Sequence, residues 1–118
     1  MNTDVARWGK AGALYDLVAT AAFLTPWTGG AMLSLLGTPT SDSTLMFATL
    51  FGTVVVMWSI ARWRKPEPLL IAIDTVGRAL FSLWFAWALW HGQTPAIALF
   101  LALELFWGAA QLRALVRR

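Results

Sequence analysis

The 118-residue chain is 58% hydrophobic and only 13% charged, and it contains eight tryptophans and no cysteine. Soluble domains are nearer half apolar and a quarter charged, so this chain has too little polar surface to cover a water-soluble globule. The composition excludes a soluble enzyme domain, a disordered chain and a disulfide scaffold, and it predicts an integral membrane protein whose partner is the lipid bilayer.

Four stretches are candidate membrane spans, because a hydrocarbon core about 30 Å thick needs roughly 20 apolar residues in a helix. They are residues 11–26, 44–62, 68–90 and 95–112. The first ends near Pro26, which lacks a helix donor, and the Gly29–Gly30 pair weakens a helix further. Residues 31–36 then form a short segment at the membrane surface or dipping back into it. We predict an all-α fold with a single transmembrane domain over residues 1–118, an antiparallel four-helix bundle with a short interfacial segment after helix 1.

The start of the chain also has features of an export signal. It has basic residues, an apolar stretch and a small-residue triplet at residues 19–21. The apolar stretch is interrupted by Tyr15 and Asp16, whereas an export signal has an unbroken apolar region. We therefore expect residues 11–26 to serve as the first span.

Lysines and arginines are distributed unevenly among the predicted loops. They precede span 1, fill the connection between spans 2 and 3, and follow span 4: Arg7, Lys10, Arg62, Arg64, Lys65, Arg113, Arg117 and Arg118. The other two loops hold none. The positive-inside rule therefore predicts a multi-pass protein of a bacterial inner (cytoplasmic) membrane with both termini in the cytoplasm. The basic residues do not form a pattern that reads nucleic acid, so no nucleic-acid partner is expected.

Four ionisable side chains fall inside the predicted spans: Asp16, Asp74, Arg78 and Glu104. One such charge at the centre of a membrane helix costs roughly 2.5–3.5 kcal/mol on insertion scales. All four lie about 9 to 18 Å from the cytoplasmic ends of their helices, so three helices bring them to a common depth. We predict that they face the interior of the bundle as one network, with Asp74 and Arg78 paired at i, i+4 on one helical face.

Three acids oppose one base in this predicted network. If all were ionised, the net charge would be −2, so either a carboxyl holds a proton or a cation or basic partner supplies the missing charge. Three interpretations stay open: a site that binds a ligand, ion or proton; an ion-pair lock that only fixes helix register; and a contact with another subunit. Tyr15, Thr20 and Gln111 are the expected supporting polar residues.

No catalytic or metal-binding pattern accompanies these charges. The chain has a single histidine, His91, and no cysteine. It also lacks a zinc motif, a phosphate-binding loop and an evident nucleophile–base pair. We expect no catalytic residue, no metal and no cofactor.

Four spans with a carboxylate in the first give a layout similar to that of the small multidrug resistance transporters. Those proteins carry a single glutamate in the first helix and a weak charge bias, whereas this chain has Asp16, adds Arg78 to the same layer and is strongly biased. The similarity covers the architecture, and the family is not assigned.

The sequence therefore favours a small non-catalytic membrane protein, an accessory or ligand-binding component that forms a homo-oligomer or joins a larger membrane complex. The alternative is a proton-coupled transporter of small organic or lipophilic cations. In that case Asp16 or Glu104 would exchange a proton for substrate.

Overall fold

The computed structural model of the protein describes residues 3–117, and most of these are helical. The elements in order are α1 (Thr3–Thr20), the 3-10 helix η1 (Ala21–Leu24), α2 (Pro26–Leu35), α3 (Asp42–Arg64), α4 (Pro68–Trp90) and α5 (Ile97–Val116). No strand occurs between residues 3 and 117. The predicted all-α class is confirmed.

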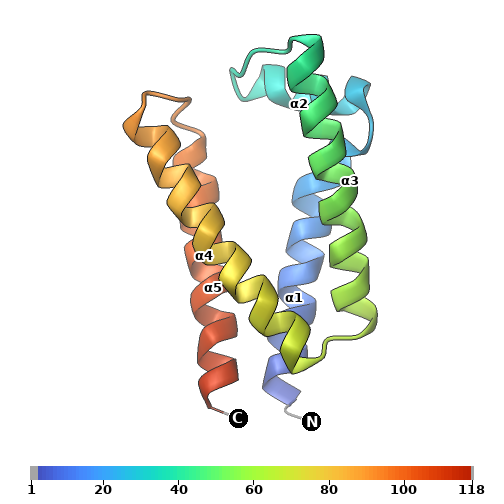
Figure 1. Ribbon diagram of the computed structural model, residues 1–118, viewed down its shortest axis with the longest axis vertical. Helices are drawn as coiled ribbons and strands as arrows, with labels where there is room; N and C mark the ends of the chain where they lie inside the picture. The colour runs from blue at the N-terminus through green and yellow to red at the C-terminus, as the bar shows by residue number, and fades with distance from the viewer. Residues whose placement is uncertain (1–2, 118) are drawn as a thin grey trace.

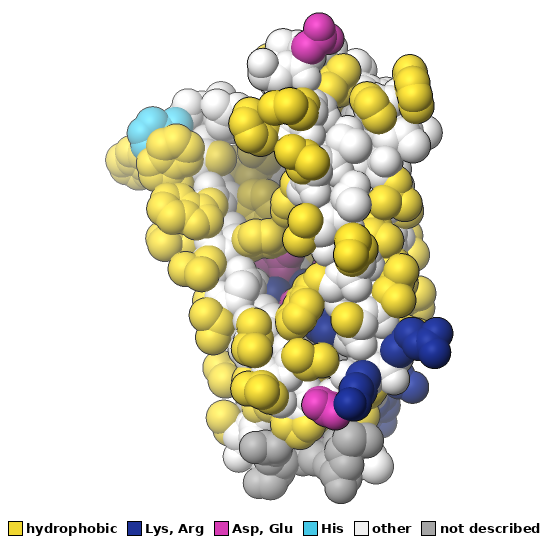
Figure 2. All heavy atoms as spheres, turned by 45° about the vertical axis from the view of Figure 1, so that its right-hand side comes forward, with side chains coloured by type: hydrophobic (Ala, Val, Ile, Leu, Met, Phe, Trp, Pro, Cys, Tyr) yellow, Lys and Arg dark blue, Asp and Glu magenta, His cyan; other side chains and the backbone are white. Residues whose placement is uncertain are grey.

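Three of the helices, α3, α4 and α5, are long and apolar enough to cross a membrane. They contain 23, 23 and 20 residues, which corresponds to about 30 to 35 Å of helix. Much of their apolar surface is not covered by the fold, and Phe47, Val76 and Leu99 are each more than half exposed. Figure 2 shows hydrophobic side chains over most of one face of the molecule. An apolar surface of this extent is typical of a protein that faces lipid.

The first helix differs from the predicted span at both ends. α1 begins at Thr3 rather than near residue 11, and its α-helical part ends at Thr20 rather than near Pro26. The chain then forms η1 and becomes extended at Thr25, whose hydroxyl oxygen accepts a hydrogen bond from the backbone N–H of Thr28. Pro26 therefore occupies the first turn of a new helix, where its missing N–H is harmless. It begins a helix instead of ending one.

The segment after this break is the ten-residue helix α2, longer than the predicted segment at residues 31–36. It includes Gly29 and Gly30, which were expected to weaken a helix. Packing compensates at Gly29, which is buried beside Phe23 so closely that a Cβ there would lie 3.3 Å from the ring. α2 ends at Leu35, and Gly37 follows its C-cap with a positive φ of 77°, which suits a glycine after a helix C-terminus.

The long helices are arranged as two pairs. α1 packs along α3, and α4 packs along α5, while α1 also contacts α5 and, to a smaller extent, α4. Figure 1 shows that both termini and the connection at residues 65–67 lie at one end of the molecule, and that α2 lies at the other. From the first end the two pairs diverge, so that α3 and α4 are separated most near α2 (Figure 1).

A small apolar cluster holds the helices together at the terminal end. Val5, Ile71 and Ala114 are buried there, from α1, α4 and α5, and Trp8 packs against them. Gly9 admits the side chain of Ile71, because a Cβ at Gly9 would lie only 2.8 Å from its Cγ1 atom. The fold is thus tight at one end and open toward the other.

Gly52 of α3 provides a test of the packing of η1. A Cβ at this position would lie 2.6 Å from the backbone oxygen of Phe23. We expect Gly52→Ala to lower the free energy of unfolding by about 1–3 kcal/mol, because the backbone of η1 must move.

The matched control is Gly77→Ala in α4, where a new Cβ has no heavy atom within 4 Å. It should be neutral or stabilise by up to about 1 kcal/mol through helix propensity. Unfolding of the two purified variants in a mild detergent measures both effects. Equal stabilities of the two variants would contradict the packing described here.

Candidate functional site

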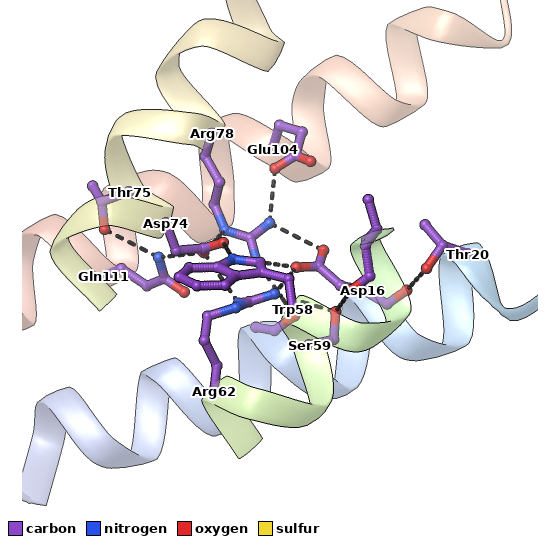
Figure 3. A network of polar contacts seen from close by, with 12 residues as sticks. Asp16, Thr20, Trp58, Ser59, Arg62, Asp74, Thr75, Arg78, Glu104 and Gln111 are labelled. Carbon is purple, nitrogen blue, oxygen red and sulfur yellow. Dashed lines mark hydrogen bonds and ion pairs between the residues drawn. The ribbon is translucent and has the colours of Figure 1, made fainter. Parts of the chain in front are cut away.

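Arg78 is the centre of a buried ionic network that joins three helices. Its Nε atom donates to Asp74 Oδ2 (2.9 Å), Nη1 donates to Glu104 Oε2 (2.7 Å) and Nη2 donates to Asp16 Oδ2 (2.8 Å). Nη1 also donates to Asp16 Oδ1, and Nη2 also donates to the backbone oxygen of Gly12, each at 3.3 Å. All five N–H groups of the guanidinium are therefore used. Figure 3 shows the four predicted residues meeting at this point.

The side chains of the network are buried inside the fold. The side chain of Arg78 is 3% exposed, and those of Asp16, Asp74 and Glu104 are 12%, 9% and 9% exposed. Buried charges persist only when they are paired and hydrogen-bonded. The structure therefore brings together the four residues singled out from the sequence, while their role in binding a ligand or proton stays a prediction.

A second arginine, Arg62, also belongs to the network, although from the sequence it was expected among the basic residues of a cytoplasmic connection. That assignment is wrong, because α3 continues to Arg64 and the side chain of Arg62 is fully buried. Its Nη2 atom donates to Asp16 Oδ2 (2.5 Å), and Nη1 lies 3.1 Å from Asp74 Oδ2.

Arg62 supplies part of the positive charge that the predicted network of three acids and one base lacks. Three carboxylates and two guanidinium groups leave a net charge of −1 if all are ionised, in place of −2. Asp16 and Asp74 each contact both arginines, whereas Glu104 contacts Arg78 alone. The deficit was the signal in the sequence that pointed to a further basic group.

Neutral side chains complete the network from α3 and α5. The indole N–H of Trp58 donates to Asp74 Oδ1 (2.9 Å), and the guanidinium of Arg62 lies 5.6 Å from the centre of the same indole ring. Ser59 accepts a hydrogen bond from Arg62 Nη2 (3.3 Å). Trp58, Ser59 and Arg62 share one face of α3 through their spacing of three and four residues, and this spacing is the signal in the sequence that could have indicated them.

The three expected supporting residues differ in where they lie. Gln111 is fully buried, and its side-chain nitrogen donates to Asp74 Oδ2 (3.0 Å) and to the hydroxyl oxygen of Thr75 (3.1 Å). Thr20 instead donates to the backbone oxygen of Asp16 (2.6 Å). Tyr15 stacks on Trp107 with ring centres 5.7 Å apart. Only Gln111 therefore bonds a charged side chain of the network.

A cavity of about 450 Å³ lies directly beside the network. The network residues Asp16, Asp74, Arg78 and Glu104 form its charged part, and its other walls are largely apolar apart from three threonines, Thr20, Thr38 and Thr94. Five phenylalanines contribute to these walls: Phe23, Phe51, Phe81, Phe85 and Phe100. Pockets that bind small molecules are commonly of about 300–1,000 Å³ and combine apolar walls with a few polar groups.

The cavity is visible from the side of the molecule on which the helix pairs diverge. Figure 2 shows a hollow between α3 and the end of α4 that carries the cyan histidine, with acidic and basic side chains at its base. Leu33 and Leu36 line the cavity at the α2 end. There the hydroxyl of Thr94 donates to the backbone oxygen of Leu36 (2.9 Å), which ties the loop before α5 to the end of α2.

No family model, curated protein or solved structure matches this chain. The chemistry of the site therefore has to follow from its own geometry. That geometry is an apolar cavity with an ionic network in its wall.

The buried position of Arg62 can be tested by comparing it with Arg64, an exposed arginine in the same turn of α3. We expect Arg62→Leu to lower the free energy of unfolding by about 3–5 kcal/mol, because the carboxylates of Asp16 and Asp74 lose a charged partner. Arg64→Leu should change it by no more than about 0.5 kcal/mol.

Reversible unfolding in detergent, followed by tryptophan fluorescence, measures both variants. If Arg62 were instead a solvated residue of the connection, the two substitutions would have the same small effect.

Proposed function

We propose that the protein is a four-span, non-catalytic membrane protein that binds a small lipophilic ligand in the cavity beside Arg78. It would act by itself, as a homo-oligomer, or as an accessory component of a larger membrane complex. The observation that carries the proposal is the apolar cavity with a buried ionic network in its wall.

The proposal takes α1 as the fourth span, together with the three apolar helices. Antiparallel packing of α1 along α3 supports this, and so does Asp16, which α1 contributes to the same network as Asp74 and Glu104. Both termini lie at one end of the molecule (Figure 1), in keeping with an even number of spans. The basic residues in the first half of α1 and around the α3–α4 connection favour the cytoplasmic side of a bacterial inner membrane for that end. α2 would then lie at the opposite interface.

A cavity favours ligand binding over an ion-pair lock that only fixes helix register. A lock needs its charged groups to be enclosed by protein, and empty apolar space beside it lowers stability. Here Asp16, Asp74, Arg78 and Glu104 all border the cavity. Their carboxylates are held in place by ion pairs with Arg78, so the charged part of the proposed binding site is fixed in position.

Photochemical labelling can test the proposed binding site. A long-chain alcohol that carries a diazirine on its tail should label Phe85 and Phe100 in lipid nanodiscs, and an excess of the unlabelled alcohol should compete. Gly77→Leu should remove this labelling, because Gly77 lines the cavity and has open space around its Cα. Peptide mass spectrometry locates the labelled residues.

Leu99 is the internal control, since it is 62% exposed and does not line the cavity. Its labelling by probe dissolved in the lipid should be the same in both proteins and should not saturate. Labelling of Phe85 and Phe100 that resists competition and is unchanged by Gly77→Leu would contradict the proposed binding site.

The second candidate function is proton-coupled transport of small organic cations, favoured by the residual charge of −1 in the network. A transporter would release protons when ethidium is added to proteoliposomes, and Glu104→Gln would abolish that release. The binding function proposed here predicts no proton movement from the wild-type protein. Proton release that depends on Glu104 would decide in favour of the transporter.

A further inference from the structure

We propose that the ligand is a lipid-soluble amine, whose protonated nitrogen binds Glu104 and whose apolar part occupies the phenylalanine-lined cavity. This inference depends on the ligand-binding function proposed above and adds the chemical class of the ligand.

The charge balance of the network favours a cation. Each carboxylate has an arginine partner, but three carboxylates against two guanidinium groups leave a surplus of one negative charge when all are ionised. That charge borders a cavity with apolar walls, where it is not solvated as it would be in water. A ligand with one positive charge would neutralise the network, whereas an anionic headgroup would raise its net charge to −2.

The hydrogen bonds of the network also favour a positively charged ligand. Every N–H group of Arg78 already has an acceptor, so an anionic headgroup would have to displace a carboxylate or the backbone oxygen of Gly12. Both oxygens of Asp16 and both oxygens of Asp74 accept hydrogen bonds. Among residues 3–117, Glu104 accepts its one hydrogen bond through Oε2, which leaves Oε1 free to accept an N–H donor.

The walls of the cavity suit the rest of such a molecule. Phe51, Phe81, Phe85 and Phe100 form a continuous series, with successive ring centres 5.9, 6.3 and 6.4 Å apart. Aromatic faces attract an organic cation and also provide apolar contact for its tail.

The opening of the cavity accounts for the expected solubility of the ligand in lipid. Phe51 belongs to α3 and Phe81 to α4, and their side chains are 44% and 38% exposed. Both line the cavity, and the helices that carry them are apolar enough to cross a membrane. A ligand dissolved in the bilayer would therefore reach the cavity past these two partly exposed rings, which contact each other at its edge.

A competition series on the wild-type protein tests the ligand class. The probe is the diazirine alcohol, and the competitors are dodecylammonium, dodecyltrimethylammonium, 1-dodecanol and dodecanoate, which share a chain length. Dodecylammonium should displace the label at a concentration about tenfold lower than 1-dodecanol, as expected for one charge-assisted hydrogen bond. The trimethyl compound, which has no N–H donor, should be intermediate, and dodecanoate should be weakest.

Glu104→Gln should remove the advantage of dodecylammonium over 1-dodecanol, because the amide keeps the shape of the side chain without its charge. Glu67→Gln is the matched control, since Glu67 lies at the start of α4, is half exposed and does not line the cavity. It should leave the order of the competitors unchanged.

The possible results separate the two proposals. Saturable labelling with equal displacement by dodecylammonium and 1-dodecanol, or with dodecanoate as the best competitor, overturns the amine class and keeps the binding site. Labelling that no competitor reduces overturns both. If Glu104→Gln does not fold, the wild-type series alone decides, because its four competitors differ only in the headgroup.

Discussion

Two buried arginines hold together the carboxylates that three different helices place inside an apolar protein, and the rest of the structure depends on this pairing. An uncompensated carboxylate in such a setting costs several kcal/mol. Arg78 binds one acid from each of α1, α4 and α5, and Arg62 adds α3 through Asp16 and Asp74. Within residues 3–117, the network is therefore the one place where α1, α3, α4 and α5 are all joined by ion pairs.

The position of the network determines the shape of the cavity. The helix pairs α1–α3 and α4–α5 converge at the terminal end, where Val5 and Ile71 pack with Ala114, and diverge toward α2 (Figure 1). The ionic groups lie where the pairs begin to separate, so they form the base of the space between them (Figure 2). The same arrangement that gives the fold its strongest contacts therefore leaves a charged group facing an apolar cavity, which is a suitable site for an amphiphilic ligand.

The sequence was sufficient to predict the residues whose charged side chains cost the most free energy to place in a membrane. Asp16, Asp74, Arg78 and Glu104 interrupt apolar stretches at similar depths, and only an inward orientation avoids exposing them to lipid. Arg62 escaped prediction because it lies at the end of its helix, where a solvated arginine and a buried one give the same local pattern. The cavity could not be predicted either, since its volume depends on how two helix pairs diverge rather than on the composition of any one helix.

The breaks between helices were harder to predict, for a local reason. Proline at position 26 fits the end of one helix and the first turn of another equally well, and only the packing of η1 against Gly52 decides between them. Gly29 and Gly30 likewise lower helix propensity, but close packing of Gly29 against Phe23 compensates within α2. Such contacts join residues from different elements, and a single sequence carries little information about them.

The most direct test of this account is a double-mutant cycle between Asp16 and Arg62, measured as free energies of unfolding for Asp16→Asn, Arg62→Leu and the double variant. A direct buried ion pair predicts that the double variant loses about 1–3 kcal/mol less than the sum of the two single losses. Losses that add to within about 0.5 kcal/mol would mean that the two side chains do not interact. The ionic network described here would then be contradicted.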